Sequence, residues 1–410
     1  MSKEKRRVPK LRFPGFTEDW EQRKLGSIGS TYTGLSGKTK EDFGHGEAKY
    51  ITYLNVFQNT ISNITMTDKV EIDPTQNEVK YGDVLFTTSS ETPEEVGMSS
   101  VWLGDTPNIY LNSFCFGFRP NQKIDSYFLG SSLRAPYMRD KIKILAQGIS
   151  RYNISKNKVM ELEISLPNNE EQKLLGTFLQ RIDLIITLHQ RKLEHLNLKK
   201  KALLQKLFPK NGERYPELRF PGFTDAWEQR KLESLGEIIT GNTPSTLKKE
   251  YWSTNSEGVV WITPTDINSV KTDWSERLLT EEGASQARIV PANSILVTCI
   301  ASIGKNTINT VEAAFNQQIN ALVPHLSNSY FILTMLNNME SAFKRVAGTS
   351  ATSIINKKEF GQLSALLPRV EEQNKIGEIF ELIDKSITLH QRKLEHLQLQ
   401  KKALLQQMFV

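Results

Sequence analysis

DLIITLHQRKLEHLNLKKKALLQKLFP, residues 183–209, returns as DKSITLHQRKLEHLQLQKKALLQQMFV, residues 384–410, with 20 identities in 27 aligned positions. Neither copy contains a glycine, and the first has a proline only at its last position, so nothing inside either block interrupts a helix. Apolar residues recur in steps of four and three, which is the spacing of a coiled-coil seam. The blocks therefore predict two long helices, each roughly 40 Å long at about 1.5 Å per residue.

The two predicted seams carry a histidine and a lysine at equivalent places. Polar seam residues lower stability but fix the register and the partner. Each helix could instead pack only on its own domain, but two near-identical seams in one chain favour an antiparallel pair, with a globular domain at either end of a rod. The predicted seam positions are Ile182, Ile186, His189, Leu193, Leu196, Lys200, Leu203 and Leu207, with Ile383, Ile387, His390, Leu394, Leu397, Lys401, Leu404 and Met408 in the second copy.

The ends of the first helix are marked in the sequence. Asn168 or Asn169 can cap its beginning, and Glu170 and Glu171 lie in the first turn, where the helix dipole favours acidic residues. The segment 209–216 contains a proline and a glycine that break the helix, so we interpret it as a linker.

A second repeated segment lies before each divergent region. LRFPGFTEDWEQRKL (11–25) returns as LRFPGFTDAWEQRKL (218–232), and residues 9–29 share 16 of 21 positions with residues 216–236. The intervening regions mix short β-type runs with helical stretches and are only faintly parallel, which indicates a whole-domain duplication rather than a solenoid. The expected organisation is an N-terminal repeated region (1–29), a first divergent domain (30–167), a central long helix (168–208), a linker with the second repeated region (209–236), a second divergent domain (237–368) and a C-terminal long helix (369–410).

Composition limits the class of protein. Hydrophobic residues make up 38% and charged residues 24% of the 410 residues, which is typical of a globular chain, and no apolar run is long enough for a membrane span. The basic N-terminus has no apolar region behind it, so we expect no signal peptide. Cys115 and Cys299 form neither a disulfide framework nor a zinc motif, and a cytoplasmic location is expected. A net charge of +6 permits a nucleic-acid partner but does not establish one.

The sequence contains no convincing catalytic or metal-binding motif. Gly37-Lys38-Thr39 resembles the end of a phosphate-binding loop, but Tyr32 stands where that loop needs a glycine. His189 and His195 are six residues apart, so they face different sides of a helix and cannot share a metal ion. We find no nucleophile elbow, dinucleotide fingerprint or adenine-methyltransferase tetrapeptide. We therefore expect no catalytic residue, no metal site and no cofactor on this chain.

The prominent aromatic residues lie in the repeated segment before each divergent domain. They could stack on bases. Because the segment is nearly the same in both copies, however, it is poorly suited to reading two different sequences. We interpret its aromatic residues as packing or subunit-docking residues, namely Phe13, Phe16, Trp20, Phe220, Phe223 and Trp227.

The order of divergent domain, repeated helix, divergent domain and repeated helix resembles the specificity subunits of type I restriction–modification systems. The resemblance covers essentially the whole chain and includes the RFPGF-x3-W segments. The most specific motifs are Leu166-Pro167, Glu171-Gln172, LHQRKL (188–193) and LLQ (203–205), with their copies at 367–368, 372–373, 389–394 and 404–406.

The resemblance implies a mixed α/β fold in which two target-recognition domains are joined by an antiparallel coiled coil, with a pseudo-two-fold internal duplication. It implies that the chain reads an asymmetric, bipartite site in double-stranded DNA and performs no chemistry. Two copies of a methyltransferase subunit would dock on the repeated regions, use S-adenosylmethionine and methylate adenine. Restriction/translocase subunits would use ATP and Mg. A rod of roughly 40 Å is comparable to one turn of B-DNA, about 34–36 Å.

Bases are expected to be read by polar and basic side chains in loops near strand ends, because such groups match the donor and acceptor pattern of base edges. A structural adaptor that holds two protein-binding modules and a self-sufficient nuclease or methyltransferase are the alternatives; steep salt dependence would favour DNA binding over the adaptor. The DNA-binding candidates are Lys38, Lys40, Asn55, Ser89, Ser90, Arg151, Tyr152 and Asn153 in the first domain, and Lys248, Lys249, Thr265, Asp266, Lys305, Thr349, Ser350 and Thr352 in the second.

Overall fold

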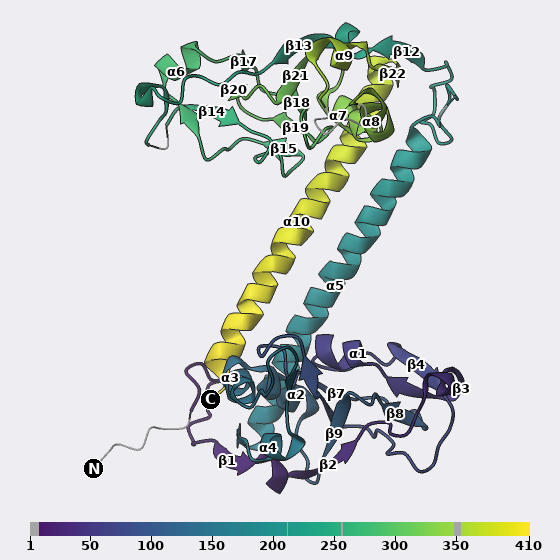
Figure 1. The fold of residues 1–410 in the computed structure, drawn as a ribbon, viewed down its shortest axis with the longest axis vertical. Helices are drawn as coiled ribbons and strands as arrows, with labels where there is room; N and C mark the ends of the chain where they lie inside the picture. Colours follow the sequence, from purple (N-terminus) through teal and green to yellow (C-terminus); the bar gives the residue numbers. More distant parts are fainter. Residues whose placement is uncertain (1–7, 211, 256, 348–353) are drawn as a thin grey trace. The chain divides into compact units, whose positions relative to one another are not determined.

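A computed structural model describes residues 8–210, 212–255, 257–347 and 354–410 (Figure 1). The chain divides into two compact units, the first formed by residues 1–190 and 393–410 and the second by residues 191–392. Both divisions fall inside long helices, α5 (Asn169–Leu207) and α10 (Val370–Met408). Each long helix therefore contributes one part to each unit.

The first unit is built around a four-stranded antiparallel sheet in the order β2-β9-β5-β7. Its inner strand β5 (Val84–Thr87) is buried at every residue, as a short, mainly apolar run predicts. Phe86 from this strand shares a hydrophobic core with Phe128 and Leu133 of α2. The remaining elements of this layer are β2 (Gly29–Thr33), β7 (Ser99–Val101), β9 (Cys115–Pro120), α2 (Ser126–Arg134), α3 (Pro136–Ile144) and α4 (Lys156–Met160).

A smaller sheet in the first unit has the order β4-β3-β8. Strand β3 (Phe43–Ile51) runs antiparallel to β4 (Thr67–Val70) and parallel to β8 (Ile109–Leu111). Helix α1 (Tyr53–Gln58) follows β3 directly, and the Thr52 side chain caps it by accepting a hydrogen bond from the Asn55 N–H. Helix α1 therefore begins immediately at the end of the central strand of this sheet.

The second unit repeats this plan with different strands. Its larger sheet has the order β13-β21-β18-β19-β15 and its smaller sheet the order β16-β14-β20-β17. Strand β18 (Ile295–Thr298) is buried at every residue, like β5. The other elements are β13 (Gly236–Thr240), β14 (Val259–Ile262), β15 (Lys271–Thr272), β16 (Leu278–Leu279), β17 (Ile289–Val290), β19 (Asn306–Asn309), β20 (Ala313–Phe315), β21 (Ile319–Pro324), α6 (Glu281–Ser285), α7 (Ser329–Asn337), α8 (Glu340–Ala347) and α9 (Lys357–Gln362).

The repeated segments form the same two-stranded sheet in both units. In the first unit β1 (Glu21–Lys24) pairs antiparallel with β11 (Glu163–Leu166), and in the second β12 (Glu228–Lys231) pairs antiparallel with β22 (Ser364–Leu367). The register also agrees, because the first glutamate of each EQRK strand lies opposite the leucine that ends its partner strand. Each repeated segment therefore lies beside the strand that leads into a long helix.

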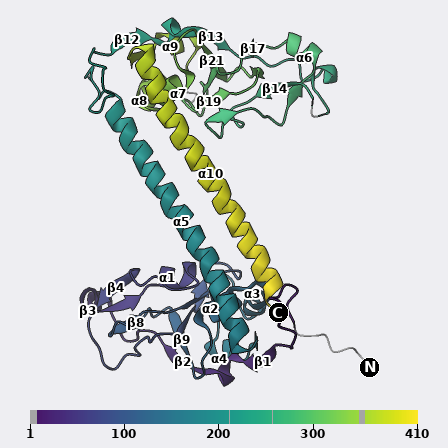
Figure 2. The same ribbon diagram turned by 180° about the vertical axis from the view of Figure 1, so that it is seen from behind.

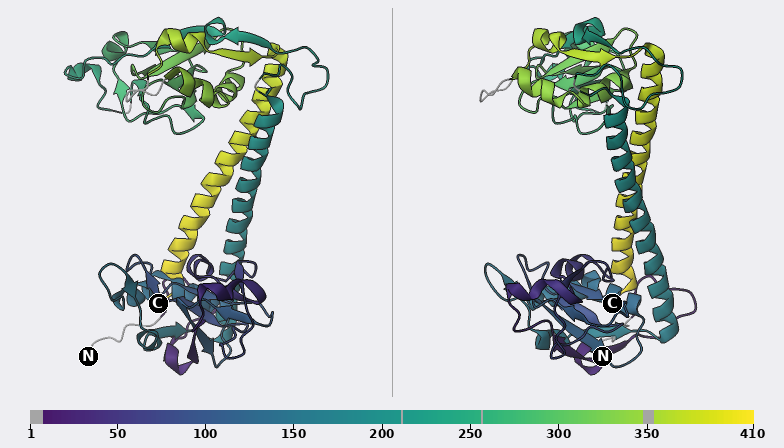
Figure 3. Two further views of the ribbon diagram at one scale, coloured as in Figure 1. Left: turned by 45° about the vertical axis from the view of Figure 1, so that its right-hand side comes forward. Right: turned by 90° about the vertical axis from the view of Figure 1, so that its right-hand side faces the viewer.

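The two long helices run antiparallel to each other within each unit. In the first unit, Asp183 near the beginning of α5 contacts Lys401 near the end of α10, at 2.5 Å, and Figure 2 shows these parts side by side. In the second unit, Lys200 lies 2.6 Å from Asp384, and Figure 3 shows the end of α5 beside the beginning of α10. The predicted mixed α/β class and the antiparallel pairing of two long helices are confirmed.

The local helix signals act as expected. The Asn168 side chain accepts a hydrogen bond from the Glu171 N–H at 2.9 Å, so Asn168 rather than Asn169 is the cap of α5. Glu170 and Glu171 lie in the first turn. The helix ends at Leu207, two residues before Pro209, which agrees with the expected break.

Candidate nucleic-acid interface

Each repeated segment is held to the first turn of a long helix by a buried ion pair. The Arg12 guanidinium donates from Nε and Nη2 to the two carboxylate oxygens of Glu171, at 2.7 and 2.8 Å. In the second unit Arg219 makes the same two bonds to Glu372, at 2.9 and 2.8 Å. Both glutamate side chains are 1% exposed, and the bond to the carboxylate raises the pKa of each arginine. We call these pairs the two clamps.

The aromatic residues of the repeated segments divide into two groups. Trp20 and Trp227 are 2% and 1% exposed, so they pack in the cores and have no face available for a base. The Trp20 ring lies edge-on to Phe409 near the end of α10, and Trp227 lies edge-on to Phe208. The phenylalanines Phe13, Phe16, Phe220 and Phe223 are only half-buried and retain surface at which another subunit could bind.

All sixteen predicted seam positions are buried or half-buried. In the second unit Leu193, Leu196 and Leu203 pack with Ile383 and Ile387. The two seam lysines do not lack partners, because Lys200 pairs with Asp384 and Lys401 pairs with Asp183. The sequence analysis did not single out these aspartates, although they begin the two aligned blocks and could have been found there.

The structure brings several candidates of the first domain together at the end of β5. Strand β6 (Ser89–Ser90) pairs antiparallel with β10 (Tyr152–Asn153). Thr88, between β5 and β6, donates its N–H to the Phe114 carbonyl, at 2.9 Å, and accepts from the Ile154 N–H, also at 2.9 Å. The loops that carry Phe114 and the segment 147–153 therefore meet at one residue.

Three polar candidates of the first domain are corrected by the structure. Asn55 is 0% exposed, and its side-chain amide donates to the carbonyls of Asn63 and Met66, each at 2.8 Å. Ser89 and Ser90 are 7% and 6% exposed, and the Ser90 hydroxyl donates to the Thr92 carbonyl at 2.5 Å. Asn55, Ser89 and Ser90 therefore stabilise the loops and cannot reach a base without rearrangement.

The remaining candidates near β10 lie at the surface. Arg151 and Asn153 are exposed and Tyr152 is half-buried. Tyr53 was missed by the sequence analysis; its hydroxyl donates to the Ser89 carbonyl at 2.6 Å. Burial raises the pKa of Tyr53.

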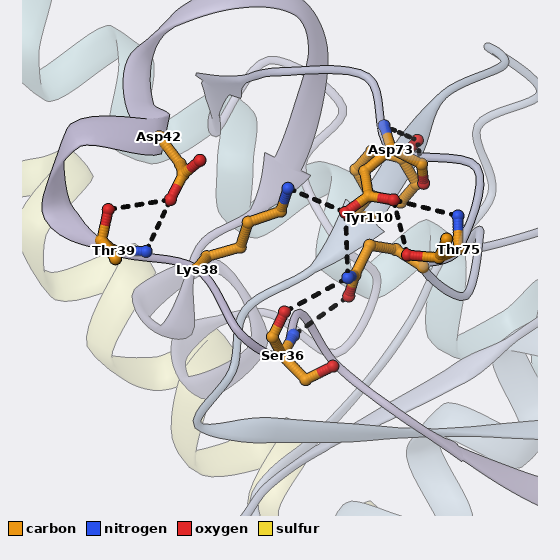
Figure 4. Close-up of polar contacts among 8 residues, drawn as sticks. Ser36, Lys38, Thr39, Asp42, Asp73, Thr75 and Tyr110 are labelled. Atoms are coloured by element: carbon orange, nitrogen blue, oxygen red, sulfur yellow. Dashed lines mark hydrogen bonds and ion pairs between the residues drawn. The ribbon is translucent and has the colours of Figure 1, made fainter.

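Lys38 is held by an acid rather than presented to solvent. Its ammonium lies 2.8 Å from Asp73, and the Lys38 side chain is 14% exposed (Figure 4). Hydrogen bonds from Lys38, then from Thr75, hold the pKa of Asp73 well below its usual range. Gly37-Lys38-Thr39 therefore belongs to a loop network, in which Thr39 and Asp42 cap a short turn, and Lys40 beside it is exposed.

In the second domain, cationic candidates rest on aromatic rings. Lys248 lies 4.8 Å from the centroid of the Tyr251 ring and donates to its hydroxyl at 2.8 Å, while Lys249 is exposed. Arg277, missed by the sequence analysis, lies 5.6 Å from the Trp252 ring. Such contacts hold a cation in place without neutralising it.

The other second-domain candidates differ in accessibility. Thr265 and Lys305 are exposed. The Asp266 carboxylate accepts from both the N–H and the hydroxyl of Thr263, each at 2.7 Å, so it stabilises its own loop. Thr349, Ser350 and Thr352 lie outside the residues that the structure describes.

The described parts of the chain lack two kinds of feature. Among these residues, no group of histidine, cysteine, aspartate or glutamate side chains has the arrangement of a metal site. Within the same residues, no helix is both long enough and apolar enough to span a membrane.

Comparisons with known proteins agree with this architecture. A family described as the type I restriction modification DNA specificity domain matches residues 17–198 and 224–399. A relative from Methanocaldococcus jannaschii, provisionally named the MjaX specificity subunit of a type I restriction enzyme, is 24% identical over 404 residues, covering 95% of this chain and 92% of the relative. The EcoR124I/EcoR124II specificity subunit of Escherichia coli is 30% identical over 250 residues, 58% of either chain. The crystal structure of the S subunit of a type I restriction–modification system from M. genitalium has a TM-score of 0.67 at 16% identity, covering 98% of this chain and 99% of that one.

Proposed function

The chain belongs to the family of type I restriction–modification DNA specificity subunits, and from this premise we propose that its two domains read the two blocks of one asymmetric DNA site. A specificity subunit supplies the DNA sequence preference of a larger complex. The two domains present different side chains on a common frame, so they are suited to different base sequences. Each domain would read one block, and the undefined base pairs between the blocks would lie between the two contacts.

The repeated segments are the proposed docking sites for two copies of a methyltransferase subunit. The observation that carries the proposal is the same bidentate arginine–glutamate pair, Arg12–Glu171 and Arg219–Glu372, in two units whose middle domains diverge. Two copies of one partner need the same surface twice, and the half-buried phenylalanines beside each clamp offer it. Restriction/translocase subunits would join through the methyltransferase subunits.

The proposed division of labour leaves the chemistry to the partner subunits. They would bind S-adenosylmethionine for adenine methylation, and ATP with Mg for translocation and cleavage. This chain would provide the DNA sequence specificity. Contacts to phosphates would position it, and contacts to base edges would select the sequence. No cofactor is assigned to the chain itself.

A methylome tests this function. The chain is co-expressed with its cognate methyltransferase subunit in a host that lacks DNA methylation, and modified bases are mapped across the genome. The expected result is one asymmetric motif of two short blocks around a gap of fixed length, with adenine modified on both strands. Exchange of residues 30–167 should change one block only. An assembled complex that modifies no site would overturn the proposal.

An arginine variant tests the first domain more narrowly. Arg151→Ala should leave the complex assembled and make the methylated motif degenerate in one block, because an exposed arginine suits guanine or phosphate. The matched control is Lys143→Ala, since Lys143 is also exposed but pairs with Glu94 in the same unit, outside the repeated segment. An unchanged motif for Arg151→Ala would remove this residue from the interface.

A further inference from the structure

We propose that Ile149 is a specificity-determining residue of the first domain and contacts the methyl group of one thymine in the DNA block that this domain reads. The proposal rests on the function proposed above. Ile149 is 96% exposed, in the segment between Gln147 and Asn153. A lone exposed apolar residue is common on protein surfaces. What distinguishes Ile149 is the way its turn is held and the groups that surround it.

The turn that carries Ile149 has a fixed shape. The Gln147 N–H donates to the Asn153 carbonyl at 2.9 Å, and the Asn153 N–H donates back to the Gln147 carbonyl at 2.8 Å. Gly148 has a φ of +133°, and a Cβ there would lie 2.1 Å from the Arg151 carbonyl oxygen, so the turn requires glycine. Because the ends of the turn are bonded together, ordering Ile149 against a ligand loses less conformational entropy than ordering a flexible loop would.

The turn is also anchored to the core of the domain. The Ile154 N–H, one residue after the turn, donates to the carbonyl of Thr88 at the end of the buried strand β5. Strand β10 adds a ladder contact between Tyr152 and Ser90. Ile149 is therefore presented at a set position relative to the rest of the domain.

The surroundings of Ile149 suit DNA rather than a protein partner. Arg151, two residues away, is exposed and makes no ion pair with any described residue, so its charge remains available for a phosphate. Phe114, whose carbonyl accepts from the Thr88 N–H, is a second exposed apolar residue in this part of the domain, at 55%. An apolar tip beside an unneutralised cation matches the edge of a DNA groove, where apolar base atoms lie next to phosphates.

The chemistry of the side chain selects the base. Isoleucine has no hydrogen-bonding group, so it cannot read the donors and acceptors of base edges. The thymine methyl group is the apolar group that base pairs present in the major groove, and apolar side chains recognise it by contact. Ile149 would therefore add discrimination of thymine from cytosine.

The experiment uses the assembled complex and the site found by the methylome. Binding is measured to duplexes in which each thymine of the first domain's block is replaced in turn by uracil, which lacks only the methyl group. Loss of one buried methyl contact should weaken wild-type binding about fourfold at one thymine. Ile149→Ala should bind the thymine and uracil duplexes equally. The control is Ile144→Ala, an isoleucine of the same unit that is 82% exposed on α3, which should keep the wild-type discrimination.

Two results would overturn the thymine contact. One is wild-type binding that is unaffected by uracil at every position of the block. The other is an Ile149→Ala complex that still discriminates at the same thymine. If DNA bending is lost in Ile149→Ala while uracil has no effect, the residue is a wedge between base steps, which also contradicts the proposal. A wild-type complex that methylates no site would instead overturn the proposed function, so the two failures are distinct.

Discussion

Asp183 and Asp384 hold the same place in the repeat but have different surroundings. Asp384 accepts from Lys200 at 2.6 Å and from the Tyr330 hydroxyl at 2.8 Å, and its side chain is 10% exposed. Asp183 pairs with Lys401 at 2.5 Å and is 30% exposed. Tyr127 lies in the same Ser-Tyr-Phe sequence as Tyr330, yet among the described residues it makes no hydrogen bond to Asp183. Equal residues in a duplicated frame therefore need not make equal contacts.

The difference arises from the divergent domains. In the second unit Lys271, at β15, lies 2.7 Å from Glu381 on α10. The first unit has Gln180 at the position that matches Glu381, so no ion pair of this kind can form there. The second domain is thus tied to α10 through Lys271 and Tyr330, while the helix pairing itself uses the same Lys–Asp contact in both units.

The arginine–glutamate pairs of the two clamps should contribute similar stability, although in the first unit the Trp20 indole N–H also donates to Glu171, at 3.2 Å. Arg12→Ala and Arg219→Ala should each lower the free energy of unfolding by about 4 kcal/mol, because each leaves a buried glutamate without its counter-charge. Urea unfolding followed by tryptophan fluorescence measures this, with each transition fitted separately. Arg23→Ala is the control and should change stability by about 0.5 kcal/mol or less, since its pair is exposed. Strongly unequal losses would show that the frames differ.

The two aspartates should contribute unequally to the free energy of unfolding. Asp384→Ala should destabilise the protein by about 3 kcal/mol, because it leaves Lys200 and the Tyr330 hydroxyl without a partner. Asp183→Ala should remove about 1 kcal/mol, since Asp183 is more exposed and Lys401 can be solvated instead. The same unfolding measurement decides, and equal losses would contradict the comparison.

Tyrosine variants test the hydrogen bond that Asp384 accepts from Tyr330 and that Asp183 lacks. Tyr330→Phe should lower stability by about 1.5 kcal/mol, because it removes one hydrogen bond to a charged group and leaves the ring in place. Tyr127→Phe is the matched variant and should leave stability unchanged. In an Asp384→Ala background, Tyr330→Phe should have no further effect, and a double-mutant cycle measures this coupling. Additive losses would mean that the hydroxyl stabilises the protein by another route.

The smallest effect concerns pH. The bond with Lys271 lowers the pKa of Glu381 in the folded protein. The stability that this glutamate adds is therefore complete above its unfolded pKa, about 4.3, and is lost as the pH falls through its lower folded pKa. Lys271→Gln should lower the free energy of unfolding at neutral pH by about 0.5 kcal/mol. When unfolding is measured from about pH 7 to pH 3, the free energy of unfolding should fall less steeply with decreasing pH in Lys271→Gln than in the wild type. Identical pH profiles would refute the role of this pair.

Local patterns predicted the long helices well. The seam depends on steps of four and three along the chain, and residues such as Leu196 and Ile383 have few other ways to remove apolar surface from water. Asn168 was recognised as a possible cap because capping uses groups only three residues apart. The duplication was visible as direct repetition of sequence.

Polar residues in loops were predicted less well. Asn55 was expected at the DNA surface, but its amide is used by carbonyls 8 and 11 residues away. Lys38 is held by Asp73, 35 residues along the chain, in a bond that no local pattern indicates. The clamps were also missed, although the arginine and the glutamate of each pair are present in both copies. A polar side chain has several possible partners, and the fold selects among them.

Length, repetition and heptad spacing are properties of neighbouring residues, and for this chain they were sufficient to define two divergent domains, two long helices and a duplicated frame. Folding decided which polar groups are used inside the protein and which remain at its surface. Asp183 and Asp384 show why. Both copies of the repeat contain the aspartate, but the deeper burial of Asp384 and its second hydrogen-bond partner, Tyr330, depend on a residue about 50 positions away. Ile149 shows the converse, because it is apolar yet remains exposed in a turn that is closed by the backbone bonds between Gln147 and Asn153.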